Sequence, residues 1–154
     1  MARVDNAYNA LTKAADGTQT AFGNSAALTA AGAGAGTDAK ADVLFFPAKI
    51  VETNDFAINF GAKDSLYLGE GYTLGAGTVD ATGHITGGNN NTLEVFFIKD
   101  NGLVKAVVET SAFGSSTAEL TAGPHADNVA IITLTGVTDV SQVSFANGVI
   151  SHVA

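Results

Sequence analysis

The sequence contains no cysteine and no tryptophan, and only two of its 154 residues are proline. The absence of cysteine excludes disulfide bonds, thiolate metal ligands and a cysteine nucleophile. The absence of tryptophan removes the usual stacking platform of sugar-binding sites. Charged residues are scarce too, at 14% of the chain against a typical value of about 25%. The polar surface must therefore consist mainly of Thr, Ser, Asn and Gly.

The few charges are mostly negative, since 15 acidic and 7 basic residues give a net charge of −8. This balance argues against nucleic acid and anionic membrane surfaces as partners, because both are bound through Lys and Arg. No stretch approaches the ~20 apolar residues of a membrane-spanning helix, so membrane insertion is not expected. Residues 1–20 contain no apolar run of signal-peptide length. If the protein is exported, we expect a route that needs no N-terminal signal.

A change of composition divides the chain into an N-terminal arm with its linker, residues 1–41, and a β domain, residues 42–154. The arm is dominated by Ala, Gly, Thr and Asn, and the run Ala30–Gly36 has only Ala and Gly. Such a run has nothing bulky to bury, which favours a flexible connector or a closely packed extended segment. Earlier in the arm, Val4, Tyr8 and Leu11 have the spacing of one helix face and predict a short helix.

From residue 42 onward, Val, Ile, Phe and Thr gather in short segments separated by Gly- and Asn-rich turns, the pattern of successive strands. This pattern predicts an all-β fold, an antiparallel β-sandwich or jelly roll. The expected strands are Val43–Val51, Phe56–Phe60, Ser65–Leu68, Thr92–Ile98, Leu103–Thr110, Thr117–Thr121, Val129–Thr135 and Val143–Val153.

Two Asn-Gly pairs predict β-hairpins, because both central residues of a type I′ turn need positive φ. Asn147-Gly148 is expected to join the last two strands. At Asn101-Gly102, a two-residue loop places Glu94 opposite Glu109, and facing carboxylates are unfavourable. Either a cation lies between them or the loop has three residues, Asp100–Gly102. We favour the three-residue loop, which shifts the register.

No catalytic motif is present, so the chain is not expected to be an enzyme. The three histidines lie far apart in the sequence, which favours surface residues over a metal site. Calcium is the most plausible ligand, with Asp64, Asp80 and Asp100 as candidate ligands in turns. The sequence has no EF-hand spacing and no calcium-binding nonapeptide repeat. Asp and Asn also favour turns for conformational reasons alone.

Four segments of the β domain resemble the C-terminal regions of bacterial repeats-in-toxin proteins secreted by type I systems. They are Asp55–Gly69, Asn89–Phe97, Ile131–Val137 and the closing Val143–Ile150, which resembles an uncleaved C-terminal export signal. The resemblance covers residues 43–154 and implies an extracellular or cell-surface location. The family's nonapeptide repeats are missing, so its calcium-driven folding does not carry over.

Together these patterns predict a secreted structural protein, a subunit of a filament or biofilm matrix whose partners are other copies of itself. Strands with few Lys and Pro leave sheet edges open to pairing, and the N-terminal arm is the expected donor of an added strand. Four large apolar residues of the arm, Val4, Tyr8, Leu11 and Phe22, are the expected subunit contacts. The alternative is a calcium-dependent adhesin or glycan-binding module that binds polysaccharide through loops 69–91.

Overall fold

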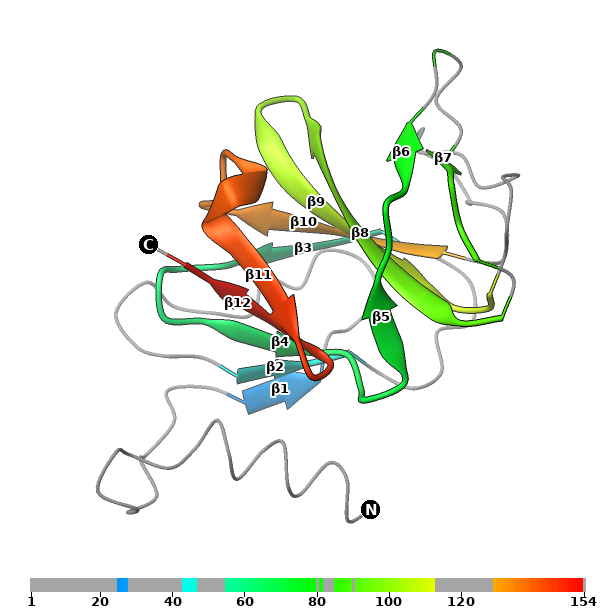
Figure 1. The fold of residues 1–154 in the computed structure, drawn as a ribbon. Coiled ribbons are helices and arrows are strands. Elements are labelled where there is room, and N and C mark those ends of the chain that lie inside the picture. Colours follow the sequence, from blue (N-terminus) through cyan, green and yellow to red (C-terminus); the bar gives the residue numbers. More distant parts are fainter. Residues whose placement is uncertain are drawn as a thin grey trace.

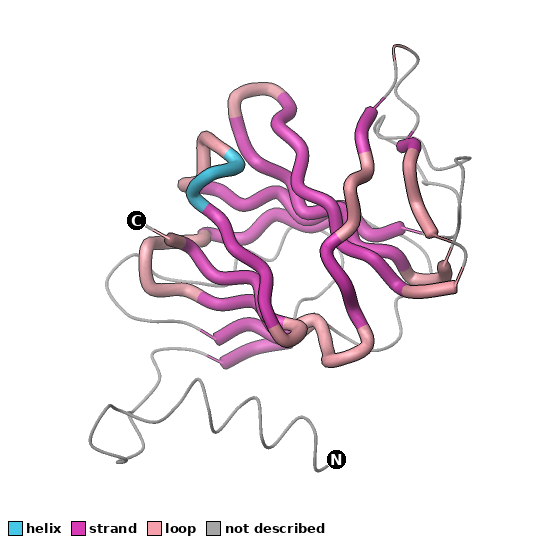
Figure 2. The backbone as a smooth tube through the Cα atoms, in the orientation of Figure 1, coloured by secondary structure: helices cyan, strands magenta, loops and turns pink. Residues whose placement is uncertain are grey.

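The all-β fold expected from the sequence is confirmed by the computed structural model (Figure 1). The model describes residues 25–27, 43–46, 55–79, 81, 85–89, 91–112 and 129–153. In Figure 2, strands dominate this part of the chain, and its one helical element is the short 3-10 helix η1. The elements are β1 Ser25–Ala27, β2 Val43–Phe45, β3 Asp55–Asn59, β4 Ser65–Tyr67, β5 Tyr72–Leu74, β6 Thr78–Val79, β7 Ile85–Thr86, β8 Leu93–Asp100, β9 Leu103–Glu109, β10 Val129–Thr135, η1 Val140–Gln142, β11 Val143–Ala146 and β12 Val149–His152.

The strands form two five-stranded sheets and a small β6–β7 ribbon. The first sheet has the order β1-β2-β4-β12-β11 and the second has the order β3-β10-β9-β8-β5. The pairing is mixed rather than purely antiparallel, because β1–β2, β2–β4, β3–β10 and β5–β8 are parallel pairs. Hairpin signals in the sequence can indicate only the antiparallel pairs, since parallel neighbours need a long connection.

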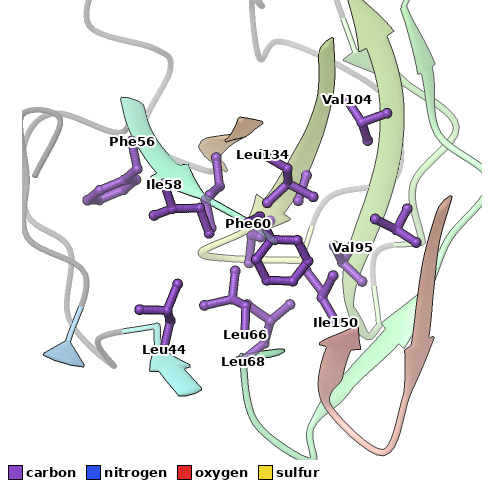
Figure 3. Packing of buried hydrophobic residues seen from close by; sticks show 14 of the residues in the cluster. Leu44, Phe56, Ile58, Phe60, Leu66, Leu68, Val95, Val104, Leu134 and Ile150 are labelled. Atoms are coloured by element: carbon purple, nitrogen blue, oxygen red, sulfur yellow. The ribbon is translucent and has the colours of Figure 1, made fainter. Parts of the chain in front are cut away.

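The main core lies between the two sheets, as in a β-sandwich (Figure 3). Leu44, Leu66 and Ile150 from the first sheet belong to the same buried cluster as Ile58 and Leu134 from the second. Each of these side chains is at most 1% exposed. This shared core fixes the two sheets against each other.

A second apolar cluster covers the outer face of the second sheet, whose edge strands are β3 and β5. It is centred on Phe96 and includes Ile98, Val107, Val129 and Ile131. The segment between β5 and β6 crosses this face. A Cβ on Gly75 would lie 2.1 Å from the Phe96 ring, and one on Gly77 would lie 2.5 Å from it. Glycine is therefore needed here for close packing on an aromatic ring.

The segment 69–91, expected to be loops, also contains β5, β6 and β7. Two further expectations, the helix containing Val4, Tyr8 and Leu11 and the strand Thr117–Thr121, lie outside the described residues.

The β8–β9 hairpin shows that the favoured three-residue loop is wrong. Asp100 pairs with Leu103, so the loop is the two residues Asn101 and Gly102, whose φ angles of 50° and 80° fit a type I′ turn. Asp100 is held in the strand by Lys105, whose Nζ lies 2.7 Å from its Oδ2. Two acidic residues facing each other at the other end of this hairpin therefore do not force a change of register.

Glu94 and Glu109 are accommodated by backbone donors. The Glu94 N–H donates to Glu109 Oε2 at 2.9 Å, and the Asn89 N–H donates to Glu94 Oε2 at 2.6 Å. Hydrogen bonds to a charged acceptor are about twice as strong as neutral ones. These contacts allow both side chains to be buried, Glu94 at 8% and Glu109 at 0% exposure.

The β11–β12 hairpin has the expected Asn147-Gly148 turn, with φ angles of 51° and 77°. Its turn packs against the chain after β4: the N–H groups of Leu68 and Gly69 both donate to the Gly148 carbonyl. A Cβ on Gly148 would lie 2.2 Å from the Gly69 carbonyl oxygen. The hairpin is thereby locked to β4.

Candidate functional site: the two edges of the β1–β11 sheet

The first sheet, of order β1-β2-β4-β12-β11, is called the β1–β11 sheet after its two edge strands. One edge strand comes from the N-terminal arm and the other from the C-terminal hairpin (Figure 1). Exposed edges carry backbone N–H and C=O groups that can pair with another chain. We therefore take these two edges as the candidate interaction site.

The first edge is β1, the described part of the N-terminal arm. It pairs in parallel with β2, and Ser25, Ala26 and Ala27 lie opposite Val43, Leu44 and Phe45. The pairing extends over these three residues, and the β1 sequence has only small residues. Little apolar surface is therefore available in this strand to strengthen its backbone pairing.

The neighbour of β1 is anchored independently of it. Val43 is 3% exposed and Leu44 is 0% exposed. On its other side β2 pairs with β4, and the Phe46 N–H after β2 donates to the Tyr67 carbonyl at 2.9 Å. The Phe46 ring also packs edge-on against Phe56 of the opposite sheet, with centroids 6.5 Å apart. Strand β2 is thus anchored by its own buried side chains and by its pairing with β4.

The second edge is β11, which pairs with β12. It contains Val143, Ser144, Phe145 and Ala146, without charge or proline. Val143 is buried and Phe145 packs against the main core, whereas Ser144 and Ala146 are exposed. This edge is built from a local hairpin and is held by its buried side chains.

The strand is preceded by η1, which Asp139 caps. Its Oδ1 accepts from the backbone N–H and the hydroxyl of Ser141, and Gln142 completes a capping box. These hydrogen bonds, first from the backbone and then from the side chain of Ser141, lower the pKa of the exposed Asp139 carboxyl. The cap fixes the point at which β11 begins.

The four predicted subunit contacts, Val4, Tyr8, Leu11 and Phe22, lie outside the described residues. Their role therefore stays a prediction. The strand β1 follows Phe22 by three residues, and its Ser-Ala-Ala sequence carried no strand signal that could have indicated it.

Two of the three predicted calcium ligands, Asp64 and Asp100, lie in the described part of the chain. Asp64 is buried in a turn, where its Oδ2 accepts from the Gly61 N–H at 2.7 Å. Asp100 lies at the end of β8 with Lys105, and Asp80 lies outside the described residues. Within the described ranges there is no group of three or more His, Asp or Glu side chains arranged to hold a metal ion. Calcium binding stays a prediction.

One of the three histidines, His152, is in the described part of the chain. It lies on β12, where its Nδ1 is 2.9 Å from the Phe60 carbonyl oxygen and its ring stacks on the Phe60 ring. These contacts join the two sheets. The histidine is thus a packing residue at the sandwich border rather than a fully solvated one.

Tyr72 has a role beside the buried glutamates that was not predicted from the sequence. Its hydroxyl donates to the Glu109 carbonyl at 2.7 Å. Burial, followed by the negative charge of Glu109, raises the pKa of Tyr72 to about 12. This hydrogen bond attaches the edge strand β5 to β9, across β8.

None of the helical segments that the structure describes is long and apolar enough to cross a membrane. The sequence matches no protein-family model, and none of the curated proteins is significantly similar to it.

Proposed function

We propose that this chain is a subunit of an extracellular filament or matrix, and that it polymerises by exchanging its N-terminal strand β1 between copies. The single observation that carries the proposal is the parallel pairing of β1 with β2 at the sheet edge. The hydrogen bonds of this pairing are the same whether β1 comes from the same chain or from another copy. Exchange therefore replaces each contact with an identical one.

The connection between β1 and β2 is long enough for such an exchange. Residues 28–42 separate the two strands, and 15 residues at full extension span about 50 Å. The same segment therefore reaches from an edge on one molecule to an edge on its neighbour. Donation from each copy to the next is a heterologous contact, which produces open filaments unless the rotation closes a ring.

The charge distribution supports self-association through this arm. Copies with a net charge of −8 repel one another, but no residue from Gly17 to Thr37 is charged. The acceptor strand β2 is uncharged as well. The donor and the acceptor therefore meet without bringing like charges together.

Two truncations test the proposal. Removal of residues 1–27 deletes β1, whereas removal of residues 1–20 retains it and deletes Val4, Tyr8 and Leu11. We expect filaments in negative-stain images of the full chain and no filaments after the longer truncation, with circular dichroism showing that the β-sheet is retained. The shorter truncation shows whether the three predicted contacts add to assembly. Filaments of the longer truncation would contradict the proposal.

A peptide of residues 17–37 gives an independent test. It supplies β1 without a β domain, so it should occupy the β2 edge of the longer truncation and raise its melting temperature, because it binds the native state alone. A peptide with Pro in place of Ala26 is the matched control, since proline removes a backbone donor. Equal effects of the two peptides would argue against strand addition.

A further inference from the structure

The free edge of β11 has a specific pattern of unpaired backbone groups. In a two-residue hairpin the residues flanking the turn form a hydrogen-bonded pair, and bonded pairs then alternate along the strands. Ala146 and Ser144 therefore bond to β12, and the N–H and C=O groups of Val143 and Phe145 point outward. The Val143 N–H is already used, because it donates to the Val140 carbonyl. Within the described residues, the Val143 carbonyl and both backbone groups of Phe145 make no hydrogen bond.

We propose that this edge pairs with the same edge of a second copy, antiparallel and about a two-fold axis centred on Phe145. In this register the two Phe145 residues exchange two hydrogen bonds. The Val143 carbonyl of each copy then faces the Asn147 N–H of the other, which makes no hydrogen bond among the described residues. All three outward groups of the edge become paired, and the group that η1 already occupies is not needed.

The side chains and charges of β11 fit a second copy. The strand has no charged residue, although each copy carries a net charge of −8. Ser144 of one copy lies opposite Ala146 of the other, and both side chains are small and exposed. The edge β3 in the other sheet begins instead with the carboxylate residue Asp55, and β5 has only three residues. Among these edges, β11 combines the longest uncharged strand with an exposed outer surface.

This interface is independent of β1 exchange. It lies at the opposite edge of the same sheet, and its closed two-fold symmetry forms pairs rather than chains. Pairing of β11 would join two sheets into one ten-stranded sheet. If β1 exchange also occurs, the β11 interface links neighbouring filaments side by side.

Disulfide cross-linking tests the register, because the natural chain has no cysteine. We mix full-length Ser144→Cys with full-length Ala146→Cys under mild oxidation and follow the mixed dimer by mass. The mixed disulfide should form more than about tenfold faster than that between Ser144→Cys and Ala57→Cys, because paired edges hold their cysteines at high effective concentration. Ala57 is an exposed residue of β3 and serves as the control.

The same experiment has results that would overturn the proposal. One is a mixed dimer that forms no faster than the control. Another is preferential cross-linking of Ser144→Cys to itself, because that pairing is out of register. Absence of the β11 cross-link in a sample that still forms filaments would leave strand exchange intact and eliminate this second interface alone.

Charge variants provide a second measurement. The double variant Ser144→Lys, Ala146→Lys places like charges opposite each other, as does Ser144→Glu, Ala146→Glu. Each variant should lose the concentration-dependent dimer in sedimentation experiments, and an equal mixture should restore it as a heterodimer. Failure of the mixture to associate, while both variants keep their circular dichroism spectra, would contradict the two-fold register.

Discussion

The two edges of the β1–β11 sheet differ in how the chain builds them. The edge strand β11 belongs to a hairpin. Its four residues pair with the four residues of β12, and a two-residue turn joins the two strands. The edge strand β1 is a three-residue segment placed in parallel beside β2 from across a 15-residue connection. A local hairpin with buried side chains is difficult to replace, whereas a short strand on a long connection is easily exchanged. This contrast is the reason for proposing exchange at β1 rather than at β11.

The largest expected loss of stability comes from the strands next to the two edges, β2 and β12, whose side chains belong to the shared core. Leu44→Ala in β2 and Ile150→Ala in β12 each remove a fully buried side chain from the shared core. Each should lower the free energy of unfolding by about 2–5 kcal/mol, as large-to-small core changes do, measured by urea denaturation. If β2 is anchored by the core rather than by β1, removal of residues 1–27 should cost less than Leu44→Ala. The reverse order would show that β1 is an integral part of the fold.

The next prediction concerns the turn that locks β11 and β12. Gly148→Ala combines a positive φ of 77° with a Cβ that would lie 2.2 Å from the Gly69 carbonyl oxygen. We expect a loss of stability of about 3 kcal/mol or more. Gly102→Ala is the matched control, because Gly102 has a φ of 80° but no atom within 4 Å of the added Cβ. Its cost should be about 1–2 kcal/mol, and equal costs would refute the close packing on Gly69.

A smaller effect is expected at the β5 edge of the other sheet. Tyr72→Phe removes the hydrogen bond to the Glu109 carbonyl and should cost about 1 kcal/mol at neutral pH. The folded protein holds the pKa of Tyr72 at about 12, above its ordinary value of 10.0. The stabilisation is therefore present below pH 10 and is lost as the pH rises through about 12.

The matching measurement compares melting temperatures of the natural chain and Tyr72→Phe from neutral pH to pH 12. The difference between the two should shrink over the upper two pH units. A constant difference would show that burial and the charge of Glu109 do not raise the pKa of Tyr72 in the folded protein.

Much of the fold could be predicted from local signals. Alternating or continuous Val, Ile and Phe marked β3, β8, β9 and β10, and Asn-Gly marked both turns. The register of β8 and β9 was predicted incorrectly, because a carboxylate pair was judged by its sequence neighbours alone. The donors that bind Glu94 and Glu109 include the Asn89 N–H, which only the folded chain brings close.

The remaining features depend on packing over long sequence distances. Gly75 and Gly77 look like turn residues, but their role is to lie against the Phe96 ring. Strand β1 has no apolar sequence pattern, and it pairs with β2 from across a 15-residue connection. The strand in the arm could not be located from the sequence, and its addition to a neighbouring copy stays a prediction.

The central claim is that β1 is exchanged between copies, and one double variant tests it directly. Ser25 and Val43 are register partners, and adjacent strands lie about 4.8 Å apart, within the Cα range of a disulfide. Ser25→Cys, Val43→Cys should be oxidised under assembly conditions and separated by non-reducing electrophoresis. Exchange predicts a ladder of covalent dimers, trimers and longer products that collapses on reduction. A single internally cross-linked monomer, with the filaments present, would contradict the account.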